Sequence, residues 1–127
     1  KPNNVDKTMS APVTVIIAYD VAFWQYAERM FPQNPAVQLA FKDNPAGAET
    51  AAFRNGSLQG AYFIVAARAV GLDCGPMSGF DNTMVDEAFF AETMFRSNFL
   101  CNIGYGDASK TFKRLPRLDF DVACQVL

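Results

Sequence analysis

The sequence contains no histidine among its 127 residues. This absence excludes Ser-His-Asp and Cys-His nucleophile arrangements, and every metal site that needs an imidazole ligand, within these residues. The sequence also lacks a phosphate-binding glycine-rich loop and a pair of carboxylates arranged for catalysis. It therefore predicts no metal site and no catalytic side chain, so an enzyme built on this chain would take its chemistry from a bound cofactor.

Cysteine is scarce, and no two of the three cysteines form a Cys-x-x-Cys pair. Such an odd and scattered set favours buried free thiols in a reducing compartment over a disulfide framework. We therefore expect Cys74, Cys101 and Cys124 to be buried thiols and the protein to be cytoplasmic.

The net charge is also small, and the apolar stretches are short. A net charge of −2 argues against a surface that neutralises nucleic-acid phosphates. The longest apolar stretches, residues 13–19 and 61–67, are far shorter than the roughly 20 residues of a membrane span. No basic segment followed by an apolar one opens the chain, which predicts no signal peptide. We expect neither a nucleic-acid partner nor a membrane.

The chain is half apolar and long enough for one folded domain. Its local patterns predict strands separated by helices, which is the α+β class. We expect strands at residues 13–19 and 97–106, and a loop or short strand at 72–80. The expected helices are 21–30 with Asp20 as its N-cap, short ones at 36–43 and 83–90, and a long one at 46–70. Asp81 or Asn82 would cap the helix at 83–90, and residues 1–10 would form an approach segment or a helix end.

The long helix predicted at residues 46–70 is the most informative element. Between residues 57 and 71 its only charged side chain is Arg68, and Gly71 stands where a C-terminal glycine cap belongs. A helix that is apolar nearly all round is covered on every side, either by other elements or by a partner subunit. Gly56 and Gly60 favour close approach of a neighbouring element.

Two segments could bind a ligand, and both also have a purely structural interpretation. Gly71, Gly75 and Gly79 recur every four residues, and amides near them could bind a ligand, although a tight connection also needs glycine. Residues 107–127 hold four of the eleven basic residues. Arg114 and Arg117 could clamp a phosphate there, or form an ordinary solvated face.

The stretch Gly71-Leu-Asp-Cys-Gly-Pro-Met-Ser-Gly-Phe-Asp81, with the helix before it, resembles the FMN-dependent nitroreductase family. Residues 98–107 and 114–117 continue the resemblance in the same order. Within the family, the stretch is most similar to malonic semialdehyde reductases of bacterial uracil (pyrimidine) catabolism. The resemblance implies one nitroreductase-like domain over residues 1–127, with a mainly antiparallel central sheet flanked by helices, and a homodimer whose core contains the long helix.

The resemblance also implies where FMN binds. Pro76 would pack on the face of the isoalloxazine ring, with Met77 beside it, while the amides of Ser78 and Gly79 reach N5 and O4. Many family members carry Glu where this chain has Ser78, a departure that matters little for a contact made by the main chain. Arg117, and with a less constant spacing Arg114, would bind the phosphate.

The implied activity is NAD(P)H-dependent reduction of malonic semialdehyde to 3-hydroxypropionate, by ping-pong hydride transfer through flavin N5. Alternatives are a broad nitroaromatic or quinone reductase acting on a small-molecule electron acceptor, and a non-catalytic flavin-binding scaffold. Family members have a further N-terminal helical segment with basic phosphate ligands, which residues 1–10 do not match. Because the chain starts at Lys1 rather than Met, we expect it to be tagged, processed or incomplete.

Overall fold

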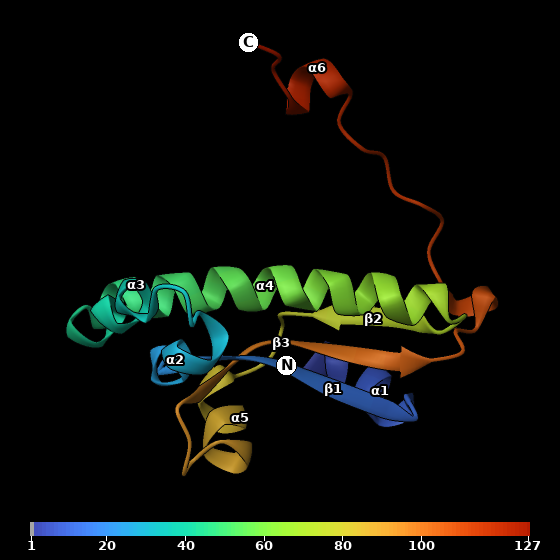
Figure 1. The fold of residues 1–127 in the computed structure, drawn as a ribbon. Helices are drawn as coiled ribbons and strands as arrows, with labels where there is room; N and C mark the ends of the chain where they lie inside the picture. Colours follow the sequence, from blue (N-terminus) through green and yellow to red (C-terminus); the bar gives the residue numbers. More distant parts are fainter. Residues whose placement is uncertain (1) are drawn as a thin grey trace.

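A computed structural model describes residues 2–127 of the chain. The elements alternate between helices and strands along the sequence (Figure 1). In order they are α1 (Pro2–Ser10), β1 (Val13–Asp20), the 3₁₀ turn η1 (Phe23–Tyr26), α2 (Ala27–Met30), α3 (Pro35–Leu39), η2 (Ala40–Asp43), α4 (Pro45–Ala69), β2 (Asp73–Met77), α5 (Asn82–Phe89), β3 (Phe95–Gly104), η3 (Ala108–Lys110) and α6 (Phe120–Ala123).

The three strands form one antiparallel sheet in the order β1-β3-β2. The central strand β3 places Phe99 opposite Ile17 of β1 and Leu100 opposite Met77 of β2. Helix α4 covers one face of the sheet, while α1 and α5 lie on the other side (Figure 1). The structure confirms the predicted α+β class with an antiparallel sheet flanked by helices.

Both ends of α4 are set by local sequence. Asn44 caps its start by accepting a hydrogen bond from the Gly47 amide at 3.0 Å, and Pro45 occupies the first turn, where no amide partner is needed. At the other end, Gly71 adopts a positive φ of 87°, which only glycine reaches without strain. The predicted glycine cap is thus confirmed, and it turns the chain directly into β2.

Helix α4 packs on the sheet through a narrow stripe of small residues. The buried positions are Ala48, Ala52, Gly56, Gly60 and Ala67. A Cβ atom placed on Gly60 would lie only 2.6 Å from the Phe99 ring and 3.1 Å from Ile17 Cγ2. The expected close approach at these glycines is confirmed, and the element that approaches is the sheet.

The opposite side of α4 is open to solvent within this chain. Leu58, Tyr62 and Val65 are 57, 77 and 65% exposed. The accessible surface of the whole chain is 9945 Å², whereas a compact monomer of 14.0 kDa exposes roughly 6,700 Å². Of the two kinds of cover expected for this helix, elements within residues 2–127 do not supply it on this side, and cover by a partner subunit is untested.

The first half of the chain also differs from the sequence prediction. The helix expected at residues 21–30 is split into η1 and α2, and Asp20 ends β1 instead of capping a helix. Its carboxylate accepts a hydrogen bond from the Ala22 amide at 2.8 Å, which closes a turn. The segment expected at 36–43 is likewise split into α3 and η2, and residues 2–10 form the full helix α1.

The three cysteines are free thiols, but only one of them is buried. Cys101 is completely buried beneath α4, Cys74 is partly buried, and Cys124 is exposed. The prediction of buried thiols is wrong for Cys124 because that residue lies near the end of the chain, outside the packed layers.

The last segment of the chain, residues 107–127, leaves the sheet and is called the arm below. It starts at the end of β3, passes the C-terminal end of α4 and runs away from the packed layers (Figure 1). Its apolar side chains are exposed, including Phe112 at 92%. The arm is therefore a second apolar surface that the rest of this chain does not cover.

We expect Gly60→Ala to destabilise the protein, although alanine favours helices by about 1 kcal/mol over glycine. The added methyl group would overlap the Phe99 ring, and overpacking of this kind costs about 1–3 kcal/mol. Thermal unfolding followed by circular dichroism should show a lower midpoint for Gly60→Ala and little change for Gln59→Ala, an exposed neighbour on the same helix. A raised midpoint for Gly60→Ala would contradict the close contact.

Candidate functional site

The candidate cofactor-binding residues Pro76, Met77, Ser78 and Gly79 lie where β2 ends. Successive side chains of a strand point to opposite faces, so Pro76 and Met77 face different sides of the sheet. Pro76 pairs with Cys101 on the α4 side, and Met77 pairs with Leu100 on the α1 side. Because β2 is an edge strand, the missing Pro76 amide costs no ladder hydrogen bond to a further strand.

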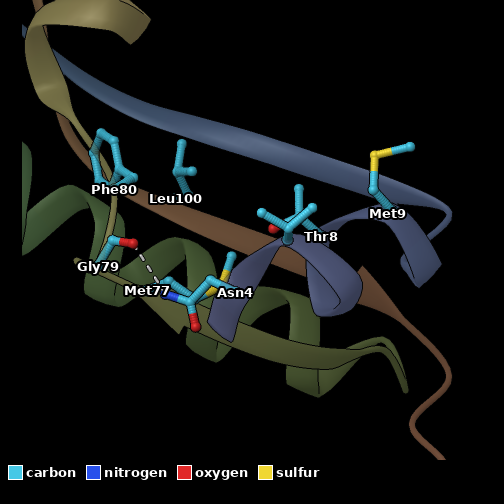
Figure 2. A pocket seen from close by; sticks show the side chains of 8 residues that line it. Asn4, Thr8, Met9, Met77, Gly79, Phe80 and Leu100 are labelled. Carbon is cyan, nitrogen blue, oxygen red and sulfur yellow. Dashed lines mark hydrogen bonds between the residues drawn. The ribbon is translucent and has the colours of Figure 1, made fainter. Parts of the chain in front are cut away.

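A cavity of about 190 Å³ lies between α1 and the end of β2 (Figure 2). Met77 and Leu100 form its floor on the sheet, and Phe80 closes it on one side. Its lining is mostly apolar and carries two polar side chains, Asn4 and Thr8. The complete lining is Asn4, Val5, Thr8, Met9, Met77, Gly79, Phe80 and Leu100. This is a surface for an apolar or aromatic group with a few polar contacts at its rim.

Asn4 joins α1 to the candidate segment. Its side-chain amide donates a hydrogen bond to the Gly79 carbonyl at 3.1 Å (Figure 2). The contact spans 75 positions in the sequence, and no local motif gives Asn4 a role. The apolar signal is one pair, Val5 and Met9, spaced four positions apart in a polar segment, which was too weak to predict the helix or its docking position.

A second contact fixes α1 on the sheet. The Asn102 side chain donates to the Lys7 carbonyl at 3.0 Å and accepts from the Thr14 hydroxyl at 2.9 Å. Asn102 lies on the same face of the sheet as Met77, since it pairs with Gly75 two residues earlier on β2. The cavity therefore has a helix wall that is attached at two separated points.

The segment after Met77 is held from its other end by α5. Asp81 caps that helix by accepting from the Met84 amide at 3.1 Å, as predicted. The Asn82 side chain donates to the Ser97 carbonyl at 2.8 Å, and Asp86 accepts from the Ser97 amide at 2.8 Å. Because both ends are fixed, the amides of Ser78 and Gly79 have a defined orientation before any ligand binds.

Arg114 and Arg117 are exposed and belong to the arm, which runs away from the sheet and from this segment (Figure 1). Within residues 2–127, the Arg117 guanidinium donates only to the local carbonyls of Leu115 at 2.8 Å and Pro116 at 3.2 Å. A single chain thus brings Pro76, Met77, Ser78 and Gly79 together and leaves the two arginines separate from them.

The titratable groups near the segment do not suggest a nucleophile. Burial raises the pKa of the Cys101 thiol, with the neighbouring Cys74 thiol adding to the effect. The Cys101 thiol therefore stays protonated and unreactive at neutral pH. At the start of the arm, hydrogen bonds from the Ser109 hydroxyl and amide lower the pKa of Asp107. This carboxylate is a helix cap for η3.

Residues 2–127 show no sign of a metal site or of a membrane-spanning helix. No group of three or more Cys, Asp or Glu side chains comes together there in a way that could hold a metal ion. In the same residues, no helix combines the length and the apolar composition needed to cross a membrane.

No family model matches the chain. It is 59% identical over 125 residues, 97% of its length, to the "Putative NADH dehydrogenase/NAD(P)H nitroreductase HadB" of Ralstonia pickettii, of which it covers 64%. Three further curated relatives are 56 to 60% identical. The chain spans 60 to 65% of the length of these four curated relatives.

Solved structures with low sequence identity have the same fold. A "putative nitroreductase ydfN" from Bacillus subtilis superposes with a TM-score of 0.86 at 20% identity, over 98% of this chain and 68% of that one. A "putative NAD(P)H:FMN oxidoreductase" from Staphylococcus epidermidis gives 0.81 at 19% identity, over 98% and 65%. The expected nitroreductase-like fold is thereby confirmed.

We expect Asn4→Asp to loosen the segment after β2. The substitution replaces a donor with a carboxylate that faces the Gly79 carbonyl, so an attractive contact becomes repulsive. Hydrogen exchange measured by mass spectrometry should be faster at residues 78–80. Thr8→Val, which changes another polar residue of the same cavity, should leave exchange there unchanged. Equal exchange in wild type and Asn4→Asp would show that this contact does not hold the segment.

Proposed function

We propose that the protein is an FMN-dependent NAD(P)H oxidoreductase of the nitroreductase family that works as a homodimer. Its similarity over nearly the whole chain to a protein named as an NAD(P)H nitroreductase carries this proposal. The shared fold supports it, and one of the structural neighbours is described as an NAD(P)H:FMN oxidoreductase. The free cysteines fit a reducing compartment such as the cytoplasm.

The residues at the end of β2 fit a flavin ring. The apolar wall of Met77, Phe80 and Leu100 suits the flat face of an aromatic system. The amides of Ser78 and Gly79 would donate to ring heteroatoms, and Pro76 would contact the ring from the strand edge. When bound, FMN supplies the exchange of a hydride between a nicotinamide and a second substrate.

The proposed chemistry needs no catalytic side chain from this chain. The residues of this chain would bind the flavin ring, orient it and polarise it. The amides of Ser78 and Gly79, in a segment held by α1 and α5, would donate to positions where negative charge develops, and fixed donors stabilise such charge more than water does. The Cys101 thiol behind the strand has a raised pKa and takes no part.

The phosphate of FMN would be bound by Arg117, with Arg114 as a further contact. Both arginines are exposed and lie on the arm. Guanidinium groups suit phosphate oxygens because they donate two parallel hydrogen bonds. The distance between arm and strand within one chain means that a site containing both would be shared between subunits.

A second copy of the chain is the partner that the exposed surfaces favour. The outer face of α4 presents Leu58, Tyr62 and Val65, and the arm presents Phe112. Two such faces are self-complementary about a twofold axis, which is the commonest symmetry of soluble oligomers. In this arrangement the arm of each subunit reaches across α4 toward the partner.

The substrate we propose is malonic semialdehyde, which would be reduced to 3-hydroxypropionate with NADPH or NADH as the electron donor. The support is the resemblance of residues 71–81 to reductases of pyrimidine catabolism. Reduction adds a hydride to the aldehyde carbon and a proton to its oxygen. A nitroaromatic or quinone acceptor is the alternative, because a reduced flavin also passes electrons to such small molecules.

We expect the purified protein to show the visible absorption of a flavin, and Arg117→Ala to weaken FMN binding. Loss of a charge-assisted contact should raise the dissociation constant about 10- to 100-fold. Titration of the apoprotein with FMN measures this change. Lys113→Ala removes an equal charge from the same arm and serves as the control. A colourless protein that does not take up added FMN would contradict the proposed cofactor.

The same variant tests whether subunits share the site. Arg117→Ala dimers and Gly79→Val dimers should both bind FMN poorly. Mixed dimers should regain one intact site, formed by the strand of one subunit and the partner subunit's Arg117. If mixing restores no binding, the strand and the arm of one site belong to the same subunit.

We expect faster NADPH oxidation with malonic semialdehyde than with a nitroaromatic compound, compared as kcat/KM under identical conditions. Formation of 3-hydroxypropionate, followed by chromatography, should match the NADPH consumed one to one. Assays with NADH in place of NADPH give the nicotinamide preference. Turnover of the nitroaromatic with none of the aldehyde would overturn the proposed substrate and leave the oxidoreductase activity in place.

A further inference from the structure

One carboxylate, that of Asp73, joins three segments of the chain. Asp73 is the first residue of β2. Its Oδ1 atom pairs with the guanidinium of Arg68 in the last turn of α4. Its Oδ2 atom accepts a hydrogen bond from the Gly106 amide at 2.7 Å, just beyond the end of β3. Each carboxylate oxygen thus has its own partner, so the group cannot rotate without losing one of them.

The contact with Gly106 lies at the point where the arm leaves the body of the protein. Within residues 2–127, the residues that follow Gly106 form hydrogen bonds only with other residues of the arm. The bond from Gly106 to Asp73 is therefore the last hydrogen bond that connects the arm to the sheet. A hydrogen bond to a charged acceptor at this distance is of the strong type.

A small rotation at this anchor has a large effect at the arginines. Arg117 follows Gly106 by 11 residues. A fully extended chain of this length reaches at most about 40 Å, so a rotation of about 10° at the anchor would move the far end of a straight arm by as much as roughly 7 Å. Such a displacement exceeds what a guanidinium–phosphate contact tolerates.

We infer that Asp73 is a positioning residue for the cofactor site, because its carboxylate sets the direction in which the arm carries Arg117. This inference rests on the proposed function, in which Arg117 binds the FMN phosphate. Arg68 holds the carboxylate in the orientation that Gly106 needs. It is the only charged residue between positions 57 and 71, which this role accounts for.

The ion pair between Arg68 and Asp73 is too exposed to contribute much to the stability of the fold. The side chains of Arg68 and Asp73 are 57 and 49% exposed. Ion pairs with this exposure contribute little to the free energy of unfolding. A variant at Asp73 should therefore keep its fold and its thermal midpoint while the arm loses its fixed direction.

Two variants act on the contact from opposite sides. Asp73→Asn removes the charge that Arg68 pairs with. Gly106→Ala keeps Asp73 but places a Cβ atom 3.0 Å from Oδ2, which forces the two groups apart. Asp43→Asn makes the same chemical change as the first variant at an exposed position on η2, remote from the arm, and is the control.

FMN titration of the apoproteins should show a dissociation constant raised about tenfold in Asp73→Asn and in Gly106→Ala, and unchanged in Asp43→Asn. Trypsin should cleave after the four basic residues of the arm faster in the first two variants than in wild type. The thermal midpoints of the FMN-free variants should stay close to that of FMN-free wild type, a result that a merely structural role would not give.

The outcomes separate this inference from the proposed function. Wild-type protein that binds no FMN would overturn the proposed function and with it the role of Asp73 at the cofactor. Wild-type protein that binds FMN, together with both variants binding it equally well, would overturn the role of Asp73 alone. A loss of FMN affinity that is matched by a large fall in thermal midpoint would also overturn it.

Discussion

The close contact between α4 and the sheet is the constraint on which the rest of the structure depends. At Gly60 the helix backbone approaches the Phe99 ring so closely that no side chain fits between them. Only small residues occupy this stripe, while large apolar side chains such as Leu58, Tyr62 and Val65 lie on the exposed side of α4. The small residues of α4 therefore pack on the sheet, while its larger apolar residues form an exposed outer face.

This arrangement decides where a ligand can bind. With α4 packed on one face, the other face and the edge strand β2 remain for α1 and the segment after Met77. The cavity there is built from backbone groups and apolar side chains, with Asn4 as a structural link. A site of this composition can hold and polarise a cofactor but supplies no acid, base or nucleophile of its own, in keeping with a sequence that has no histidine.

Much of the fold could be predicted from local sequence because its signals are local. The β-branched run of β1, the caps at Asp81 and Gly71, and the breakers around Asn44 each act over a few residues, and the structure confirms them. Residues 21–30 could not be predicted in this way. Their aromatic cluster forms a 3₁₀ turn because Phe23 packs on Phe41, a contact 18 positions away that no periodicity reveals.

The candidate site was predictable only in part, for a related reason. Pro76, Met77, Ser78 and Gly79 are contiguous, so a sequence motif was enough to bring them together. The contact from Asn4 and the two-sided bonding of Asp73 depend on tertiary structure, in which a helix at the start of the chain and a turn near its end meet the same strand. A helix sequence that is apolar on all sides also does not show whether the same chain or a partner subunit packs against the helix.

The separation of strand and arm has a thermodynamic consequence. A ligand that binds only an assembled state stabilises that state by mass action. In the proposed homodimer, the strand of one subunit holds the ring and the partner's arm holds the phosphate, so FMN would bind the dimer more tightly than the single chain. FMN would therefore help to hold the two subunits together. The apolar face of α4 would then need to contribute less to the stability of the dimer than it would without the cofactor. The anchor at Asp73 completes this coupling, since an arm with a fixed direction loses less conformational entropy when it engages the phosphate.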